Sequence, residues 1–155
     1  MLNTIVAFSD SHGAPLPSTL IDVASECKHV FFLGDGVSRL DSILCHKGFY
    51  GVKGNCDTVN FPTEQVLNID GVKILLTHGD KYHVKRSLFE LSLRARELDC
   101  SLVFYGHTHF ADITEENGIT FICPGSPTFP QGGCPGYAYV VIHKGNFTAK
   151  MVNLT

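Results

Sequence analysis

The sequence predicts an α/β fold that contains two β-sheets. In its first third, short apolar runs alternate with helical stripes, which is the order of a parallel sheet with crossover helices. Beyond residue 110, strands follow one another with only turns between them, which is the order of a sheet connected by hairpins. The chain has 155 residues, of which 44% are hydrophobic and 17% are charged. These values are typical of a compact globule, so we expect residues 1–155 to form a single domain.

The opening of the chain predicts three strands joined by two helices. Leu20, Val23 and Ala24 are spaced so that one helix face can pack on a sheet. A second helical stripe begins at Val37, and Gly48 follows it as a stop. The predicted strands are residues 2–9, 29–33 and 49–53, and the predicted helices are residues 19–27 and 37–46.

The remainder of the chain predicts one more helix and several hairpins. Asp70-Gly71 lies between two apolar runs and is a strong hairpin turn. Residues 124–136, rich in proline and glycine, predict an ordered loop near the site, and we expect the aromatic residues Phe129 and Tyr137 to pack in the core rather than line a cleft. The predicted helix is 87–98, and the predicted strands are 64–69, 72–77, 101–105, 111–116, 119–123, 136–143 and 146–154.

Polar side chains follow five of the predicted strands at the point where each strand ends. In parallel sheets the chemistry collects outside the carboxyl ends of the strands, so these residues are expected to meet. Because side chains alternate along an extended backbone, His107 and His109 would offer two imidazoles to one space. The five sequences are Asp10-Ser11-His12, Gly34-Asp35-Gly36, Gly54-Asn55-Cys56-Asp57, His78-Gly79-Asp80 and Gly106-His107-Thr108-His109.

This set of side chains predicts a site for two metal ions. Carboxylates, one carboxamide and four imidazoles suit Mn²⁺, Fe²⁺, Ni²⁺, Co²⁺ or Zn²⁺ better than calcium or magnesium. Seven groups are too many for one ion, whereas two ions that share Asp35 would use them all. Two such ions about 3.5–4 Å apart can hold a hydroxide and clamp a phosphoryl group. Two carboxylates and one hydroxide would leave a net charge of about +1, which suits a phosphate ester anion.

Composition and charge also exclude several classes of protein. The net charge is −3 and no basic run is present, so we expect no stable binding of nucleic acid. The longest apolar runs are far shorter than the roughly 18 residues of a membrane-spanning helix. None of the six cysteines forms a C-x-x-C pair, and no charged leader with a cleavage site opens the chain. We therefore expect free thiols and a cytoplasmic protein.

The ordered motifs resemble those of the calcineurin-like metallophosphoesterase superfamily. The series is Asp10-x-His12, Gly34-Asp35, Gly54-Asn55-x-Asp57, His78-Gly79 and Gly106-His107-x-His109. The short length, the wording of residues 54–57 and the sequence Pro124-Gly125-Ser126 are most similar to the small YfcE-type phosphodiesterase branch. The resemblance covers residues 5–127 and implies a four-layer αββα sandwich of two mixed β-sheets.

The resemblance also implies a division of the metal ligands. It assigns Asp10, His12, Asp35 and His109 to the first ion and Asp35, Asn55, His78 and His107 to the second, so that Asp35 bridges. We expect manganese, with nickel, iron, cobalt and zinc as alternatives. The implied enzyme is a binuclear metal-dependent phosphoesterase, preferentially a phosphodiesterase, in which a metal-bridging hydroxide attacks a small phosphate ester. Its candidate catalytic residues are Asp35, Asn55, His109 and His12, and the resemblance further suggests homo-oligomers.

Two positions depart from the family pattern, and one alternative function remains open. Cys56 stands where the wider family has a histidine thought to protonate the leaving oxygen, and Cys123 stands where the family often has asparagine. We expect Asp57 to support a loop or a ligand rather than bind metal. The alternative is a non-catalytic protein-interaction scaffold of the same fold, like a retromer subunit. Such a protein would be expected to have lost ligand histidines, and this chain keeps them.

Overall fold

The computed structural model describes residues 2–154, which form two mixed β-sheets stacked between helices. The first sheet has the strand order β10-β9-β1-β2-β3. Strands β1, β2 and β3 are parallel, whereas β9 runs antiparallel to β1 and β10. Their bounds are β1 (Asn3–Phe8), β2 (His29–Phe32), β3 (Phe49–Gly51), β9 (Gly136–His143) and β10 (Asn146–Asn153).

The second sheet has the strand order β4-β5-β6-β8-β7. Strands β5, β6 and β8 are parallel, and β4 and β7 add antiparallel edges. The predicted turn at Asp70-Gly71 joins β4 to β5, with Ile69 paired to Val72. The bounds are β4 (Glu64–Ile69), β5 (Val72–Thr77), β6 (Leu102–Phe104), β7 (Asp112–Glu116) and β8 (Ile119–Cys123).

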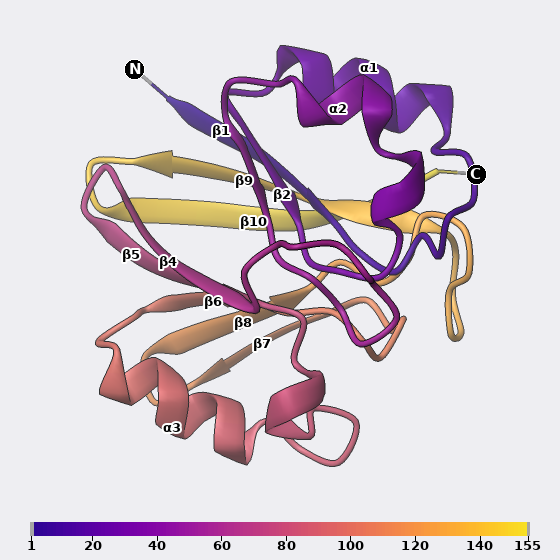
Figure 1. Cartoon of the computed structure of the whole chain (residues 1–155). Helices are drawn as coiled ribbons and strands as arrows, with labels where there is room; N and C mark the ends of the chain where they lie inside the picture. The colour runs from indigo at the N-terminus through magenta and orange to yellow at the C-terminus, as the bar shows by residue number, and fades with distance from the viewer. Residues whose placement is uncertain (1, 155) are drawn as a thin grey trace.

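The helices cover the two outer faces of the paired sheets. Figure 1 shows α1 (Ser18–Glu26) and α2 (Asp41–Leu44) above the first sheet and α3 (Phe89–Glu97) below the second. The four layers are therefore α, β, β and α, which confirms the expected sandwich. Two short 3₁₀ segments, η1 (Val37–Arg39) and η2 (Asp80–Tyr82), lie in the loops after β2 and β5.

The prediction of one helix over residues 37–46 is wrong. The segment divides into η1 and α2, and Leu40 between them has φ −101° and ψ 10°, outside α-helical geometry. The amides of Gly36 and Val37 donate to the carboxylate of Asp57. This long-range contact anchors the start of the segment and breaks the periodic pattern into two pieces.

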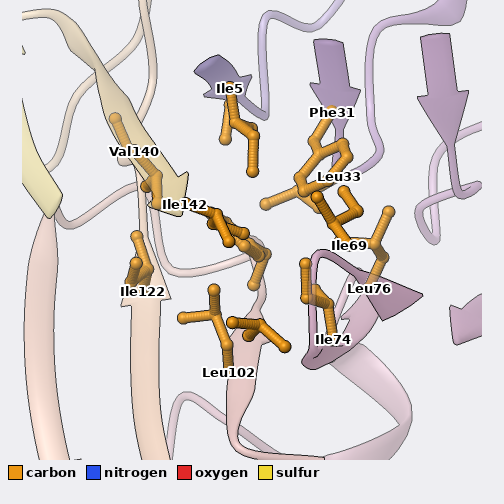
Figure 2. Packing of buried hydrophobic residues seen from close by; sticks show 14 of the residues in the cluster. Ile5, Phe31, Leu33, Ile69, Ile74, Leu76, Leu102, Ile122, Val140 and Ile142 are labelled. Carbon is orange, nitrogen blue, oxygen red and sulfur yellow. The ribbon is translucent and has the colours of Figure 1, made fainter. Parts of the chain in front are cut away.

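The core follows from the alternation of side chains along each strand. Ile5 and Ala7 of β1 point between the sheets, whereas Val6 and Phe8 point toward α1 and α2. Figure 2 shows the buried layer between the sheets, where side chains of the first sheet face side chains of the second; among them are Ile5, Phe31, Ile74 and Leu102. A third cluster packs α3 against the outer face of the second sheet through Leu91 and Ala95. Both faces of both sheets are thus covered.

Two further expectations concern the chain as a whole. All six cysteines lie in the described part of the chain and carry free thiols, as predicted. Among residues 2–154, no helix has the length and apolar character needed to cross a membrane.

Candidate metal centre

The seven predicted ligand residues lie on five loops that leave the carboxyl ends of parallel strands. Because β1, β2 and β3 run in one direction, as do β5 and β6, their following loops collect at common sheet edges. The loop after β1 holds Asp10 and His12, and those after β2 and β3 hold Asp35 and Asn55. The loops after β5 and β6 hold His78, His107 and His109.

One group of side chains is formed by Asp10, His12 and His109. The Nε2 atoms of His12 and His109 are 3.0 Å apart. The Oδ1 atom of Asp10 lies 3.4 Å from His109 Nε2 and 3.9 Å from His12 Nε2. These ligand atoms are close enough to surround a single ion. Two imidazole nitrogens at this separation must share a proton or a cation, because their lone pairs would otherwise repel.

A second group is formed by Asp35, Asn55, His78 and His107. His78 Nε2 lies 3.2 Å from Asp35 Oδ2 and 3.1 Å from Asn55 Oδ1. His107 Nδ1 lies 3.2 Å from the same Nε2 atom of His78. Asp35, His78 and His107 present their ligand atoms close enough together to hold an ion, and the amide oxygen of Asn55 adds a fourth donor.

Asp35 connects the two groups. Its Oδ2 atom is 3.2 Å from His78 Nε2 and 3.9 Å from His12 Nε2. The backbone amide of Cys56 donates to the other oxygen, Oδ1, at 2.8 Å. The carboxylate therefore faces both groups, in the position that a bridging ligand requires.

The backbone of the site adopts a conformation that non-glycine residues seldom take. Five of the seven side chains come from residues with positive φ: Asp10, His12, Asp35, His107 and His109. Such conformations persist only where the surrounding structure enforces them, and they gather at functional sites. Both imidazoles of His107 and His109 lie at this site, but the expected extended backbone between them is wrong, because these φ angles are 75° and 59°. His107 turns toward His78, whereas His109 turns toward His12.

Two histidines are oriented by hydrogen bonds to backbone carbonyls. His78 Nδ1 donates to the carbonyl of Leu33 at 2.6 Å, and His109 Nδ1 donates to the carbonyl of Phe129 at 2.7 Å. Each bond fixes the ring so that Nε2 points into the site, which is how outer hydrogen bonds usually prepare imidazole ligands.

Asp57 supports the site from behind, as expected. Its Oδ2 atom accepts from the amides of Asp35 and Gly54 at 2.8 Å, and Oδ1 accepts from Gly36 at 3.0 Å and Val37 at 3.3 Å. One carboxylate thus joins the loops after β2 and β3. Asp35 and Asn55, which those loops carry, are positioned by this contact.

Ser126 is a supporting residue that the sequence did not identify. Its buried hydroxyl donates to the carbonyl of Asp10 at 2.8 Å and accepts from the amide of Phe129 at 2.8 Å. The Pro124-Gly125-Ser126 sequence indicated a loop near the site, but only the fold reveals which backbone atoms the serine joins.

The local charges make the carboxylates and imidazoles strongly interdependent. Burial raises the pKa of Asp10, against the lowering effects of His78, Ser9 and His109. Burial also opposes ionisation of Asp35, but hydrogen bonding and charge from His78 outweigh it and lower the pKa to about 2. Burial likewise disfavours the charged form of His78, yet Asp35 and Asp10 raise its pKa. For His107, burial and the charge of His78 lower the pKa.

One buried oxygen atom of this site lacks a hydrogen-bond partner and could bind a cation instead. Among the described residues, Asp10 Oδ1 is a buried carboxylate oxygen that has no hydrogen-bond partner. Its other oxygen, Oδ2, accepts from Ser9 Oγ at 2.7 Å and from the amide of His107 at 2.9 Å. Buried carboxylate oxygens are normally paired or ligate metals. The Oδ1 atom of Asp10 faces the histidines, and an ion bound there would supply its missing partner.

Both cysteines that depart from the family pattern lie beside the site. Cys56 has its Sγ atom 3.6 Å from Asn55 Nδ2 and close to the ligand atoms of His12 and Asp35. Burial and the charge of Asp35 raise the pKa of its thiol. Cys123 is buried at the end of β8, where its Sγ atom lies 3.4 Å from Thr108 Oγ1.

Comparison with known families confirms the resemblance carried by the motifs. Residues 4–146 match the model of the calcineurin-like phosphoesterase superfamily domain. The chain belongs to this superfamily. Its members hydrolyse phosphate esters with the help of divalent metal ions, and the residues gathered here form candidate metal-binding groups of that kind.

Individual members of the superfamily are similar over most of the chain. A protein named probable metallophosphoesterase from Methanocaldococcus jannaschii is 32% identical over 137 residues, which are 84% of this chain and 70% of the relative. The structure of a predicted phosphoesterase from Streptococcus pneumoniae has a TM-score of 0.83 and 30% identity, covering 99% of this chain and 90% of that one. The metallophosphoesterase fold is therefore shared throughout.

A more distant neighbour shares the fold alone. Vps29 from Entamoeba histolytica, solved in complex with zinc, has a TM-score of 0.75 and 20% identity, with 100% of both chains covered. The same architecture therefore also belongs to proteins called Vps29.

Proposed function

We propose that this chain is a binuclear metal-dependent phosphoesterase with a preference for phosphodiesters. Asp10, His12, Asp35 and His109 would hold one ion, and Asp35, Asn55, His78 and His107 would hold the other. Two bound ions, manganese being our choice, would supply a hydroxide at neutral pH and stabilise negative charge on the phosphoryl group. The observation that carries the proposal is the position of Asp35 between the two groups, 3.2 Å from His78 and 3.9 Å from His12.

The side chains have separate tasks in this proposal. Asp35 holds the two groups of ligands together. His12, exposed over about a third of its surface, and His109 stand at the open side of the site, where they can orient the phosphate. Asn55 is also exposed and presents its amide beside His78. Asp10 and His78 are buried, and their side chains determine the charge at the bottom of the site.

The preference for activated diesters is proposed from the identity of residue 56. A thiol whose pKa is raised is a weak proton donor at neutral pH compared with an imidazolium. Esters whose leaving group needs protonation would therefore react slowly. Aryl phosphodiesters, whose leaving oxygen departs as a stable anion, would be the better substrates.

The decisive experiment measures metal content and hydrolysis in the same preparations. We expect purified protein supplied with Mn²⁺ to bind about two ions per chain and to hydrolyse bis(p-nitrophenyl) phosphate faster than p-nitrophenyl phosphate. The Asp35→Asn variant keeps the side-chain shape but loses the charge. It should bind less metal, and its kcat/KM should fall by more than about 100-fold. Exposed Asp22→Asn on α1 is the matched control. Wild-type protein without metal and without activity on both esters would refute the proposal.

The alternative is a protein-interaction scaffold without catalysis. The full-length structural likeness to Vps29 from Entamoeba histolytica favours considering it. Against it, this chain keeps all four candidate ligand histidines and places them within two compact groups. The same metal and activity measurements separate the two functions.

A further inference from the structure

Phe129 is an exposed aromatic residue held rigidly at the edge of the candidate metal centre. We expected it to pack in the core together with Tyr137. Tyr137 does so, with 5% of its surface exposed, but Phe129 has 50% exposed, so that part of the expectation is wrong. The ring of Phe129 meets that of His12 edge to face, with centroids 6.2 Å apart. A large apolar side chain thus lies open directly beside a proposed metal ligand.

The loop that carries Phe129 is fixed on both sides of this residue. The amides of Thr128 and Phe129 donate to the buried hydroxyl of Ser126 at 3.2 and 2.8 Å. The carbonyl of Phe129 accepts from His109 Nδ1, and the amide of Gln131 donates to the carbonyl of His109 at 2.8 Å. Because the backbone of this loop is already ordered, binding of a ligand against the ring would cost the protein little conformational entropy in the loop.

A second exposed phenylalanine lies against the same loop. Phe110 directly follows His109 and has 56% of its surface exposed. A β-carbon placed on Gly132 would lie 3.6 Å from its ring, so the ring passes close to the loop backbone. The amide of Phe110 donates to Thr108 Oγ1 at 3.1 Å, which holds the residue in place. Two exposed phenyl groups are therefore found at this loop, Phe129 within it and Phe110 against its Gly132.

We infer that Phe129 stacks on an aromatic ester group of the substrate, the one retained on phosphorus after hydrolysis. This inference rests on the proposed function and narrows its substrate class to diesters with a nucleobase or another aromatic ring. Aromatic rings stack readily on exposed aromatic side chains, and such stacking accepts any nucleobase because every base has a π-face. The position beside His12 places the ring within reach of a phosphate bound at the first group of ligands.

The test compares three diesters that release the same p-nitrophenolate. Bis(p-nitrophenyl) phosphate retains an aryl group, thymidine 5′-(p-nitrophenyl phosphate) retains a nucleoside, and methyl p-nitrophenyl phosphate retains no ring. In Phe129→Ala we expect the ratio of kcat/KM for each aromatic diester to that for the methyl diester to fall about 5- to 100-fold. Phe129→Trp should restore the ratio, and Phe129→Leu should not. A larger fall for the thymidine ester would identify the nucleobase, and equal falls would indicate any aromatic group.

The controls distinguish stacking from structural damage. Phe89→Ala removes an exposed ring on α3, a helix that carries none of the candidate ligands, and should leave all three rates unchanged. The inference is overturned if Phe129→Ala leaves the ratio at its wild-type value, or if Phe129→Leu retains it. If wild-type protein hydrolyses none of the three esters, the proposed function itself fails, which is a different result.

Discussion

Asp57 shows how one side chain fixes two loops without touching the proposed metals. Its four accepted hydrogen bonds all come from backbone amides, two of them belonging to Asp35 and Gly36. Bonds of this kind to a charged acceptor contribute more than neutral ones. The residue therefore holds the backbone that carries Asp35.

Replacing Asp57 with asparagine should destabilise the protein. The amide group turns one acceptor into a donor, so two of the four bonds are lost and two backbone amides are left unpaired. At about 1.5 kcal/mol for each bond, we expect a loss of about 3 kcal/mol. For a chain of this size that corresponds to a fall in Tm of roughly 6–12 °C. Thermal unfolding measures it against exposed Asp22→Asn, and a shift in Asp57→Asn no greater than the control's would contradict this role.

Cys56 makes a prediction about leaving groups. Cys56→His would place an imidazole beside Asp35 and Asn55, where its pKa suits proton donation at neutral pH. We expect kcat/KM for alkyl phosphodiesters to rise by about 100-fold or more, with little change for p-nitrophenyl esters. Cys45→His, at an exposed position outside the site, is the control. Rates on alkyl esters that stay at the wild-type level would count against a role for residue 56 in protonation.

The sequence predicted the candidate ligands of the site better than the residues that hold those ligands in place. Asp10, Asp35 and His78 follow apolar runs, so the carboxyl-end rule was enough to bring them together. The hydroxyl of Ser126 bonds to a carbonyl 116 residues away, and no local pattern contains that information. The exposure of Phe129 likewise depends on how a glycine-rich loop crosses His109, which only the tertiary structure determines.

At the scale of elements, a polar network ties the second sheet to its helix. Glu64 on β4 accepts from Arg94 of α3 and from Tyr82 of η2, the latter at 2.6 Å. Burial would raise the pKa of Glu64, but the bonds from Arg94 and Tyr82 outweigh it and lower the pKa. Burial and the hydrogen bond to Glu64 raise the pKa of Tyr82 to about 12. The segment that follows His78 is thereby attached to the sheet edge.

This network predicts that the free energy of unfolding depends on pH in the acidic range. Because the folded-state pKa of Glu64 lies below its ordinary value of 4.5, folding favours the ionised form. The contribution is complete above pH 4.5 and is lost as pH falls through the folded-state pKa. Urea unfolding should therefore show Glu64→Gln less stable than wild type at pH 7, with the difference closing below pH 4.5. Glu116→Gln, at an exposed edge, should show no such pattern; a pH-independent gap in Glu64→Gln would refute the explanation.

Elements with strong local patterns were predicted well, and those shaped by distant contacts were not. The hairpin at Asp70-Gly71 and α3 follow from turn chemistry and helical periodicity. The segment that begins at Val37 has an equally good helical stripe, yet Asp57 binds its first amides and the chain forms η1 before α2. A carboxylate 20 residues away thus overrides local propensity.

At the scale of the molecule, the proposed metal ligands come from both sheets. Asp10 and Asp35 follow strands of the first sheet, and His78 and His109 follow strands of the second. Two ions would therefore connect two layers that otherwise meet through the apolar cluster shown in Figure 2. Any ligand that binds the folded chain alone adds to its stability.

Addition of Mn²⁺ should raise the unfolding temperature of the whole chain. At a free concentration 100 times the Kd, binding contributes about 2.7 kcal/mol, which corresponds to roughly 5–11 °C. We expect a chelator to reverse the shift and Asp35→Asn to reduce it, as differential scanning calorimetry can measure. If Mn²⁺ leaves the Tm of wild-type protein unchanged at millimolar concentration, the ions do not join the sheets as proposed.

The left-handed backbone at five of the candidate ligand residues has a consequence for ion exchange. Contacts from Asp57 and Ser126 help to enforce these angles, and the carboxylate and imidazole ligand atoms of each group already lie within 4.8 Å of one another in the chain alone. Entry of one transition metal in place of another would then proceed without refolding of the surrounding chain. Selection of one metal over another would then depend on the coordination chemistry of the ligands and on which metals the cell supplies. The same scaffold could therefore work in organisms in which different transition metals are available.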